Sequence, residues 1–233
     1  MEQPFKKTLF LPKFTIKRIQ TLYNKNIKHV AIAGNIGAGK TTLAEKLGRH
    51  FDWKVMYEDV EHNPYLQDFY ENMPRWSFNL QVYFLNSRFN QVKQIQEGKV
   101  TIIQDRTIYE DAYIFAPNLY EMGLMSERDF QNYISLFKTV DSFFRPPDLL
   151  IYLRASIETL VSQIQKRGRE YEENIRIDYL GRLNKYYENW ITNYNNGNLL
   201  IIDVDNINFA DNPAHLEQVI AQVQENLENI LVT

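Results

Sequence analysis

The stretch His29-Val-Ala-Ile-Ala-Gly-Asn-Ile-Gly-Ala-Gly-Lys-Thr41 decides the fold of this chain. Its first five residues form a short, mainly apolar run, which is typical of a strand buried on both faces of a sheet. Residues 34–41 then match the pattern G-x-x-x-x-G-K-[ST] at every fixed position, and an amphipathic helical pattern follows at once. A strand, a glycine loop and a helix in this order predict a phosphate-binding loop, and hence a protein that binds a nucleoside triphosphate.

The residue types of this loop suit a polyanion. Glycines allow successive backbone N–H groups to point at phosphate oxygens, and the start of the helix adds a partial positive charge. We expect Lys40 to neutralise the β- and γ-phosphates and Thr41 to hold Mg²⁺ through its hydroxyl. The predicted triphosphate-binding set of the loop is Gly34, Asn35, Ile36, Gly37, Ala38, Gly39, Lys40, Thr41 and Thr42.

Strand-like and helical patterns alternate along the rest of the chain. Further short apolar runs occur at 53–57, 100–104, 149–153 and 199–204. Helical patterns occur at 40–51, 75–97, 108–116, 126–143, 156–166, 174–195 and 212–231. This alternation predicts an α/β fold, a P-loop NTPase-like five-stranded parallel sheet with helices on both faces.

Composition excludes several classes of function. The 233 residues include no cysteine, which excludes disulfides, thiolate chemistry and cysteine-based zinc sites. A net charge of −3 gives no support for a nucleic-acid partner. No apolar run approaches the roughly 20 residues that a membrane span needs, so we expect a cytoplasmic protein without a membrane partner.

The charge is unevenly distributed. Residues 1–28 carry seven lysines or arginines against Glu2 alone, a net charge of +6, which leaves −9 for the remainder. This leader lacks the continuous apolar region of a secretory signal. We therefore predict a basic N-terminal extension at 1–28 and a single catalytic domain at 29–233.

Charged residues follow two of the predicted strands, where ligands bind in open α/β sheets. Glu58 follows the second strand, and Asp105 and Arg106 follow the third. A carboxylate there can act as a general base, a second one beside Thr41 can complete a Mg²⁺ site, and an arginine can neutralise a transferring phosphoryl group. The alternative is that these are solvated loop residues. The predicted catalytic residues are Lys40, Glu58 and Arg106, and the predicted metal ligands are Thr41 and Asp105.

A second basic segment lies between two helical patterns. Arg167 and Arg169 flank Gly168, which gives the backbone freedom to move. These arginines can close over a triphosphate as a lid. The segment can equally be an ordinary charged helix junction, and its composition alone does not decide between the two.

Taken together, the motifs resemble the deoxyribonucleoside kinase family, which includes deoxycytidine, deoxyguanosine and bacterial deoxyadenosine kinases. The resemblance covers about residues 29–205, and the stretch 58–65 is most similar to bacterial deoxyadenosine and deoxyguanosine kinases. The segments that carry it are the phosphate loop, Glu58-Asp-Val, Arg75-Trp-Ser-Phe78 with Gln81, Ser87-Arg88, Asp105-Arg-Thr-Ile-Tyr-Glu-Asp111, Tyr113-Ile-Phe-Ala116 and Arg167-Gly-Arg169.

The resemblance implies ATP-dependent transfer of phosphate to the 5′-hydroxyl of a deoxyribonucleoside in nucleotide salvage, with Mg²⁺ as cofactor. It implies that Glu58 is the general base and that Arg106 holds both that base and the phosphate. It further implies that Tyr70 and Glu172 grip the sugar 3′-hydroxyl. The set implied to read the base is Gln81, Arg88 and Asp111, with Phe115 stacking on it. It also suggests a homodimer formed through helices near 75–97 and 126–143.

Substrate preference stays open at this point. We expect a purine deoxynucleoside, deoxyadenosine first, and the alternatives are a deoxycytidine or broad pyrimidine kinase, a nucleoside monophosphate kinase and a non-catalytic nucleotide-binding switch. Three residues depart from the family pattern. Asp59 replaces a frequent proline and is expected to raise the pKa of Glu58, Gln163 stands where some members carry an arginine, and Phe84 is large where relatives can have a small residue.

Overall fold

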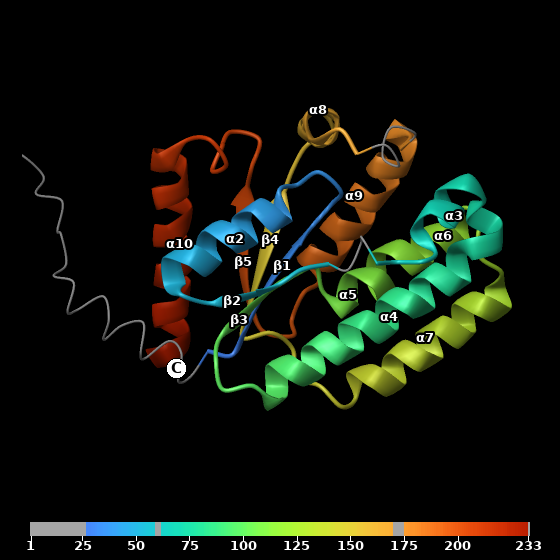
Figure 1. Ribbon diagram of the computed structural model, residues 1–233, viewed down its shortest axis with the longest axis horizontal. Helices are drawn as coiled ribbons and strands as arrows, with labels where there is room; N and C mark the ends of the chain where they lie inside the picture. Colours follow the sequence, from blue (N-terminus) through green and yellow to red (C-terminus); the bar gives the residue numbers. More distant parts are fainter. Residues whose placement is uncertain (1–26, 59–61, 170–174, 233) are drawn as a thin grey trace, which may run out of the picture.

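The computed structural model describes residues 27–58, 62–169 and 175–232 (Figure 1). Its strands form one parallel sheet in the order β2-β3-β1-β4-β5, with the phosphate-loop strand in the centre. The strands are β1 (His29–Gly34), β2 (Lys54–Met56), β3 (Ile102–Asp105), β4 (Leu149–Arg154) and β5 (Asn198–Asp203). The predicted five-stranded α/β fold is confirmed.

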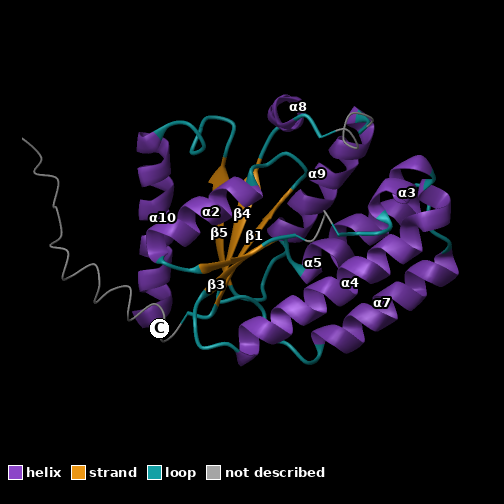
Figure 2. Ribbon diagram, in the orientation of Figure 1, coloured by secondary structure: helices purple, strands orange, loops and turns teal. Residues whose placement is uncertain are grey.

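Alternation along the strands divides the core into two layers. Val30 and Ile32 of β1 face one helical layer, and Ala31 and Ala33 face the other, because successive side chains of a strand point to opposite faces. Figure 2 shows the strands between these two helical layers. The first layer contains α2 (Lys40–Phe51), α8 (Ile157–Arg167) and α10 (Pro213–Val232). The second contains α4 (Met73–Glu97), α7 (Glu127–Asp141) and α9 (Ile177–Thr192).

Two helical regions differ from the predicted ones. The short helix α3 (Leu66–Glu71) is absent from the prediction, because six residues are too few to display a helical period. The predicted helix at 108–116 is divided and extended. It consists of α5 (Ile108–Glu110), the π-helical turn η1 (Asp111–Phe115) and α6 (Ala116–Glu121). Such π turns are frequent at functional sites.

The N-terminal end of the described chain belongs to the core. Ile27 is 1% exposed, and the carbonyl of Lys28 accepts a hydrogen bond from the N–H of Ile102 at 2.9 Å. These two residues therefore pack against the sheet just before the predicted domain start at residue 29. Within the described ranges, no helix combines the length and apolarity needed to cross a membrane.

Candidate active site

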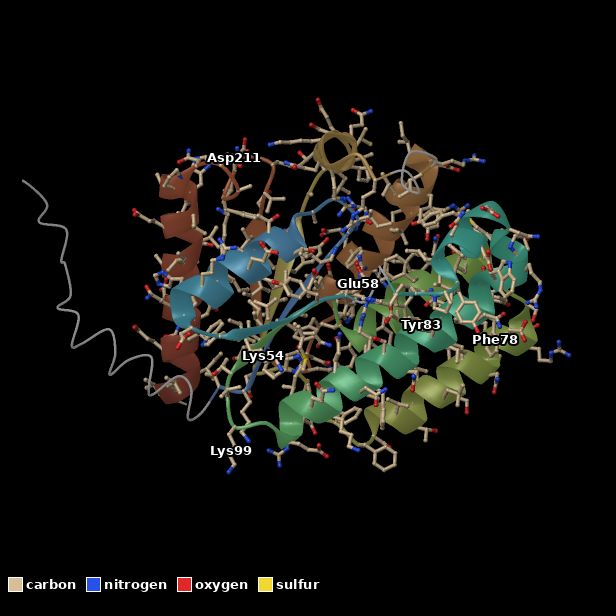
Figure 3. The ribbon with its side chains drawn as sticks, viewed as in Figure 1. Lys54, Glu58, Phe78, Tyr83, Lys99 and Asp211 are labelled. Carbon is tan, nitrogen blue, oxygen red and sulfur yellow. The ribbon has the colours of Figure 1, made fainter. Side chains whose placement is uncertain are left out.

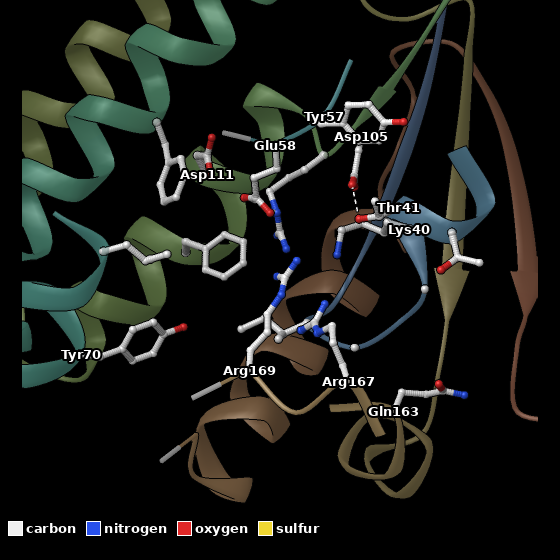
Figure 4. A pocket seen from close by; sticks show the side chains of 18 of the residues that line it. Lys40, Thr41, Tyr57, Glu58, Tyr70, Asp105, Asp111, Gln163, Arg167 and Arg169 are labelled. Atoms are coloured by element: carbon white, nitrogen blue, oxygen red, sulfur yellow. Dashed lines mark hydrogen bonds and ion pairs between the residues drawn. The ribbon is translucent and has the colours of Figure 1, made fainter. Parts of the chain in front are cut away.

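A cleft of about 850 Å³ opens at the carboxyl edge of the sheet, between the phosphate loop, the α3–α4 region and the segment after α8 (Figure 4). It brings together most of the predicted site residues, although they come from distant parts of the sequence. The predicted residues that line it are Ile36, Gly37, Gly39, Lys40, Thr41, Thr42, Glu58, Tyr70, Gln81, Asp105, Arg106, Asp111, Phe115, Arg167 and Arg169. Gly34, Asn35, Ala38 and Arg88 belong to the same region without lining the cleft.

The phosphate loop depends on glycine at two positions. Gly37 has φ +88°, and a Cβ there would lie 2.8 Å from the carbonyl oxygen of Leu160. Gly39 has φ +91° and precedes α2 without a side-chain cap, so the first N–H groups of the helix stay open to a ligand. The loop therefore has the backbone form that binds phosphate oxygens.

Asn35 fixes the loop to α9. Its Nδ2 donates to the carbonyl oxygen of Leu180 at 3.1 Å and to Oδ1 of Asn184 at 2.7 Å. Its own carbonyl accepts a hydrogen bond from Lys40 Nζ at 3.0 Å. Burial, together with the nearby Arg106 guanidinium, lowers the pKa of Lys40 to about 8. Asn35 is thus a support for the loop and for its lysine.

Thr41 and Asp105, the two predicted metal ligands, lie in direct contact. The Thr41 hydroxyl donates to Oδ2 of Asp105, whereas Oδ1 is buried and accepts no hydrogen bond within the described part of the chain. Burial raises the pKa of Asp105, partly offset by Lys40. The described residues contain no cluster of three or more His, Asp or Glu side chains that could hold a metal ion. The pair fits Mg²⁺, which usually takes one or two carboxylates and completes its shell with phosphate oxygens and water.

Glu58 lies where the sheet meets α4, near the middle of the molecule (Figure 3). Its Oε1 is 2.9 Å from NH2 of Arg88 and 3.0 Å from Nε of Arg106. Burial would raise the pKa of Glu58, but the charges of Arg106, Arg88 and Lys40 outweigh burial and lower it to about 2. The net pKa of Glu58 is therefore lowered rather than raised, and the predicted contribution of Asp59 stays a prediction, because Asp59 lies outside the described residues.

Behind Glu58 lies a buried pair of opposite charge. Nε of Arg88 is 3.6 Å from Oδ2 of Asp111, and neither side chain is exposed by more than 2%. Burial raises the pKa of Asp111 to about 7, against the lowering effect of Arg88 and Arg106. Arg88 is thus placed to hold Glu58 and Asp111 rather than to line the cleft.

The cleft wall beside this pair is formed by an amide and aromatic rings. Gln81 is 3% exposed, and its Oε1 has no hydrogen-bond partner among the residues that the structure describes. Phe84 and Phe115 line the same wall, and the Arg106 guanidinium lies 4.7 Å from the centre of the Phe115 ring. An amide with an unused oxygen beside flat rings can recognise a planar base edge.

Two residues that sequence reasoning missed hold Arg106, whose backbone has φ +70°. Its NH1 donates to the hydroxyl of Tyr187 at 3.1 Å and lies 3.6 Å from Oε1 of Glu110. The same Glu110 oxygen accepts the N–H of Gly34 at 3.2 Å, which connects the arginine to the phosphate loop. The capping pattern from Thr107 to Glu110 is a signal that could have drawn attention to Glu110. No sequence pattern marks Tyr187.

The segment after α8 carries the predicted lid arginines. Arg167 and Arg169 point into the cleft on either side of Gly168, which ends α8 with φ +65° (Figure 4). Gln163 lies in the same wall one turn earlier and supplies no positive charge. Tyr70 lines the opposite side of the cleft. Its predicted partner Glu172 lies outside the described residues.

The site combines a phosphate loop at the edge of a parallel sheet with a carboxylate held by two arginines and a further basic segment that lines the cleft. This arrangement is that of a P-loop phosphotransferase. The profile of the deoxynucleoside kinase family matches residues 30–228. This chain therefore belongs to the deoxynucleoside kinase family and is a kinase, not a non-catalytic nucleotide-binding switch.

Individual relatives are similar over most of the chain. It is 38% identical over 196 residues to the deoxyadenosine/deoxycytidine kinase of Bacillus subtilis (strain 168), and this match covers 83% of the present chain and 90% of the relative. It is 40% identical over 201 residues to the deoxyadenosine kinase of Dictyostelium discoideum, which covers 85% and 80%, respectively. A solved structure of deoxyadenosine kinase from M. mycoides with dCMP and dCDP bound superposes with a TM-score of 0.76 at 31% identity and covers 84% of this chain and 99% of that chain.

Proposed function

We propose that this protein transfers the γ-phosphate of ATP to the 5′-hydroxyl of a deoxyribonucleoside, deoxyadenosine first, in nucleotide salvage. The observation that carries the proposal is the Glu58 carboxylate, which Arg88 and Arg106 hold in a cleft shared with the phosphate loop. An acceptor hydroxyl beside Glu58 has a hydrogen-bond acceptor on one side and the phosphate loop on the other.

Glu58 would act on the hydroxyl as a permanent anion. Because its pKa is lowered to about 2, it remains ionised at neutral pH and is a weak proton acceptor before reaction. Both arginines contact Oε1, and we assign Oε2 to the substrate hydroxyl. In a loose phosphoryl-transfer transition state, the hydroxyl becomes acidic late, so Glu58 orients it first and takes its proton after bond formation has begun.

The opposite side of the cleft would stabilise the phosphates. Lys40, Arg167 and Arg169 supply positive charge there, Arg106 adds its charge from the acceptor side beside Glu58, and the N–H groups at the start of α2 supply hydrogen bonds. Thr41 and Asp105 would hold Mg²⁺ together with phosphate oxygens. The ion, when bound, neutralises phosphate charge and favours in-line transfer.

The base-reading wall supports adenine or cytosine as the base. Gln81 offers an amide donor and an acceptor side by side, which matches a base edge with an exocyclic amine beside an unprotonated ring nitrogen. Adenine and cytosine both present such an edge. The Bacillus relative is named for both deoxyadenosine and deoxycytidine, which supports deoxycytidine as the second substrate.

Assembly and organisation are part of the proposal. We propose a homodimer through α4 and α7, because Leu136 on α7 and Phe143, two residues beyond its end, are 41% and 70% exposed. Residues 1–28 would form a basic extension to the kinase domain at 29–233. The cytoplasmic location stays a prediction.

A phosphate-transfer assay tests the proposal. The purified chain is incubated with labelled ATP, Mg²⁺ and each of the four deoxynucleosides, with their ribose analogues and deoxynucleoside monophosphates as controls. We expect product from deoxyadenosine, less from deoxycytidine and little from the controls. Product from the monophosphates alone would indicate a nucleoside monophosphate kinase, and no product from any deoxynucleoside would overturn the proposal.

A further inference from the structure

A series of hydrogen bonds between three polar side chains leads from the interior of the sheet to the backbone just before Glu58. Nε2 of Gln91, on α4, donates to the carbonyl oxygen of Tyr57 at 2.8 Å. Oε1 of Gln91 lies 2.8 Å from Nε2 of Gln104, on β3. Oε1 of Gln104 lies 2.9 Å from Nε2 of His29, on β1. None of these three residues lines the cleft, and the mechanism above uses none of them.

Donors and acceptors can be assigned along these hydrogen bonds in only one way. A carbonyl oxygen can only accept, so the Gln91 group that meets Tyr57 must be its NH₂. Gln91 therefore presents its oxygen to Gln104, and Gln104 in turn presents its own oxygen to His29. The imidazole must then carry its proton on Nε2. The orientations of the two amides and the tautomer of His29 are therefore coupled, so a change in any one of them would disturb the other two.

The imidazole is suited to remain in that form. His29 is 6% exposed and Gln104 is fully buried. Burial lowers the pKa of His29 to about 4, despite the raising effects of Gln104 and the Asp148 carboxylate, which accepts the backbone N–H of His29 at 2.9 Å. Nδ1 of His29 has no hydrogen-bond partner among the described residues. A neutral Nε2–H imidazole matches these surroundings, because a proton on Nδ1 would be buried without an acceptor.

Gln91 and Arg88 act on the same segment from one helix. They are three residues apart on α4 and therefore lie on the same face. Arg88 binds the carboxylate of Glu58 at 2.9 Å, and Gln91 binds the carbonyl of the preceding residue at 2.8 Å. The helix thus holds both the side chain of Glu58 and the backbone from which that side chain projects.

We propose that Gln91, oriented by Gln104 and His29, is a positioning residue that sets the place of Glu58 relative to the acceptor hydroxyl. This inference rests on the proposed function, in which Glu58 orients the 5′-hydroxyl. Burying two amides and an imidazole costs more free energy than burying apolar residues of equal size. Their presence beneath the site therefore accords with a positioning role.

The first experiment compares two substitutions on one helix. Gln91→Met keeps the length of the side chain and removes both hydrogen bonds, and Gln94→Met makes the same change at an exposed position one turn away. We expect Gln91→Met to lower kcat about tenfold to a hundredfold, because small displacements of reacting groups are costly, while KM for ATP and deoxyadenosine changes less than about twofold. Gln94→Met should match the parent. Circular dichroism and thermal unfolding check that both variants fold.

The second experiment determines the tautomer of His29, and it does not depend on an activity assay. Long-range ¹H–¹⁵N spectra of the histidine rings at pH 7 distinguish the two tautomers, and His29→Phe identifies the signals of His29. We expect a single Nε2–H form for His29 in the parent. An Nδ1–H form, or a mixture of the two tautomers, would overturn the proposal.

Glu58→Gln separates failure of this inference from failure of the proposed function. If Glu58→Gln loses turnover while Gln91→Met and Gln94→Met both match the parent, the positioning role of Gln91 is wrong and the proposed function stands. If Glu58→Gln keeps parental turnover, the proposed role of Glu58 is wrong, and the inference about Gln91 falls with it.

Discussion

The two sides of the cleft are constructed differently. The side proposed to face the nucleoside triphosphate is a run of consecutive residues, 34–41, and depends on backbone N–H groups and glycine conformations. The side proposed to face the acceptor is assembled from Glu58 after β2, Arg88 on α4, Arg106 after β3 and Asp111 in η1. The first is local and depends on shape, whereas the second is non-local and depends on charges that balance one another. Substitutions on one side should therefore affect the ligand proposed for that side more than the ligand proposed for the other.

Glu58→Gln should have the largest effect on turnover. The amide cannot accept the proton of the 5′-hydroxyl, so we expect kcat to fall on the order of 10² to 10⁴-fold. The effect should be confined to the acceptor side, with KM for ATP within about threefold of the parent. Steady-state kinetics with varied ATP and varied deoxyadenosine measure both parameters. A kcat within about threefold of the parent would show that Glu58 is not the group that acts on the hydroxyl.

Lys40→Met should have the next largest effect, and on the other side of the cleft. Removal of the ammonium group beside the phosphate loop should lower kcat roughly 10² to 10³-fold. It should also raise KM for ATP, while equilibrium binding of deoxyadenosine to the free enzyme changes little. Calorimetry with each ligand tests this split. Equal weakening of both ligands would mean that the two sides are not independent.

Gly37→Ala tests the dependence of the loop on shape. Its φ is +88°, and the new Cβ would lie 2.8 Å from the carbonyl of Leu160, so the loop must shift. We expect a loss of about 1–3 kcal/mol in the free energy of unfolding, together with weaker ATP binding. Gly123→Ala is the matched control, because Gly123 has φ +69° with no atom within 4 Å of the added Cβ. Urea unfolding of both variants measures the difference, and equal losses would assign the whole effect to backbone conformation.

Asp111→Asn should give an effect of a different kind, a change in how the free energy of unfolding depends on pH. The folded protein raises the pKa of Asp111 from 3.8 to about 7, so between these values the native state keeps a proton that the unfolded state releases. The contribution of Asp111 to the unfolding free energy therefore falls as pH rises from about 4 to about 7, by at most about 1.4 kcal/mol per pH unit. Asp111→Asn removes this slope.

Urea unfolding at several pH values between 4.5 and 7.5 measures the slope for the parent and for Asp111→Asn. Glu58 has the opposite sign, because its pKa falls from 4.5 to about 2 and its stabilising contribution is lost only as pH drops below about 4.5. His29, whose pKa is lowered from 6.5 to about 4, adds a slope of opposite sign in this range, but it does so in both proteins, so the difference between the two curves isolates Asp111. If the parent and the variant have parallel curves there, Asp111 is ionised across the whole range.

The accuracy of the sequence predictions follows the same division. The helix after the phosphate loop is observed at 40–51, as predicted, because local signals at both ends determine it. The π turn at 111–115 was missed, since a single wider turn leaves the apolar period nearly unchanged. Glu110, Tyr187 and Gln91 were missed because their roles depend on partners up to 153 residues away.

The sequence by itself determined the phosphate loop, the five strands and the family, because backbone conformation, alternation and motif spacing are properties of neighbouring residues. Only the tertiary structure decided the ionisation state of Glu58 on the acceptor side. The neighbouring Asp59 indicated a raised pKa for Glu58, yet two arginines 30 and 48 positions further along the chain, Arg88 and Arg106, lower it to about 2. Electrostatic interactions depend on distance in space, and that distance is set by how the sheet and α4 pack together.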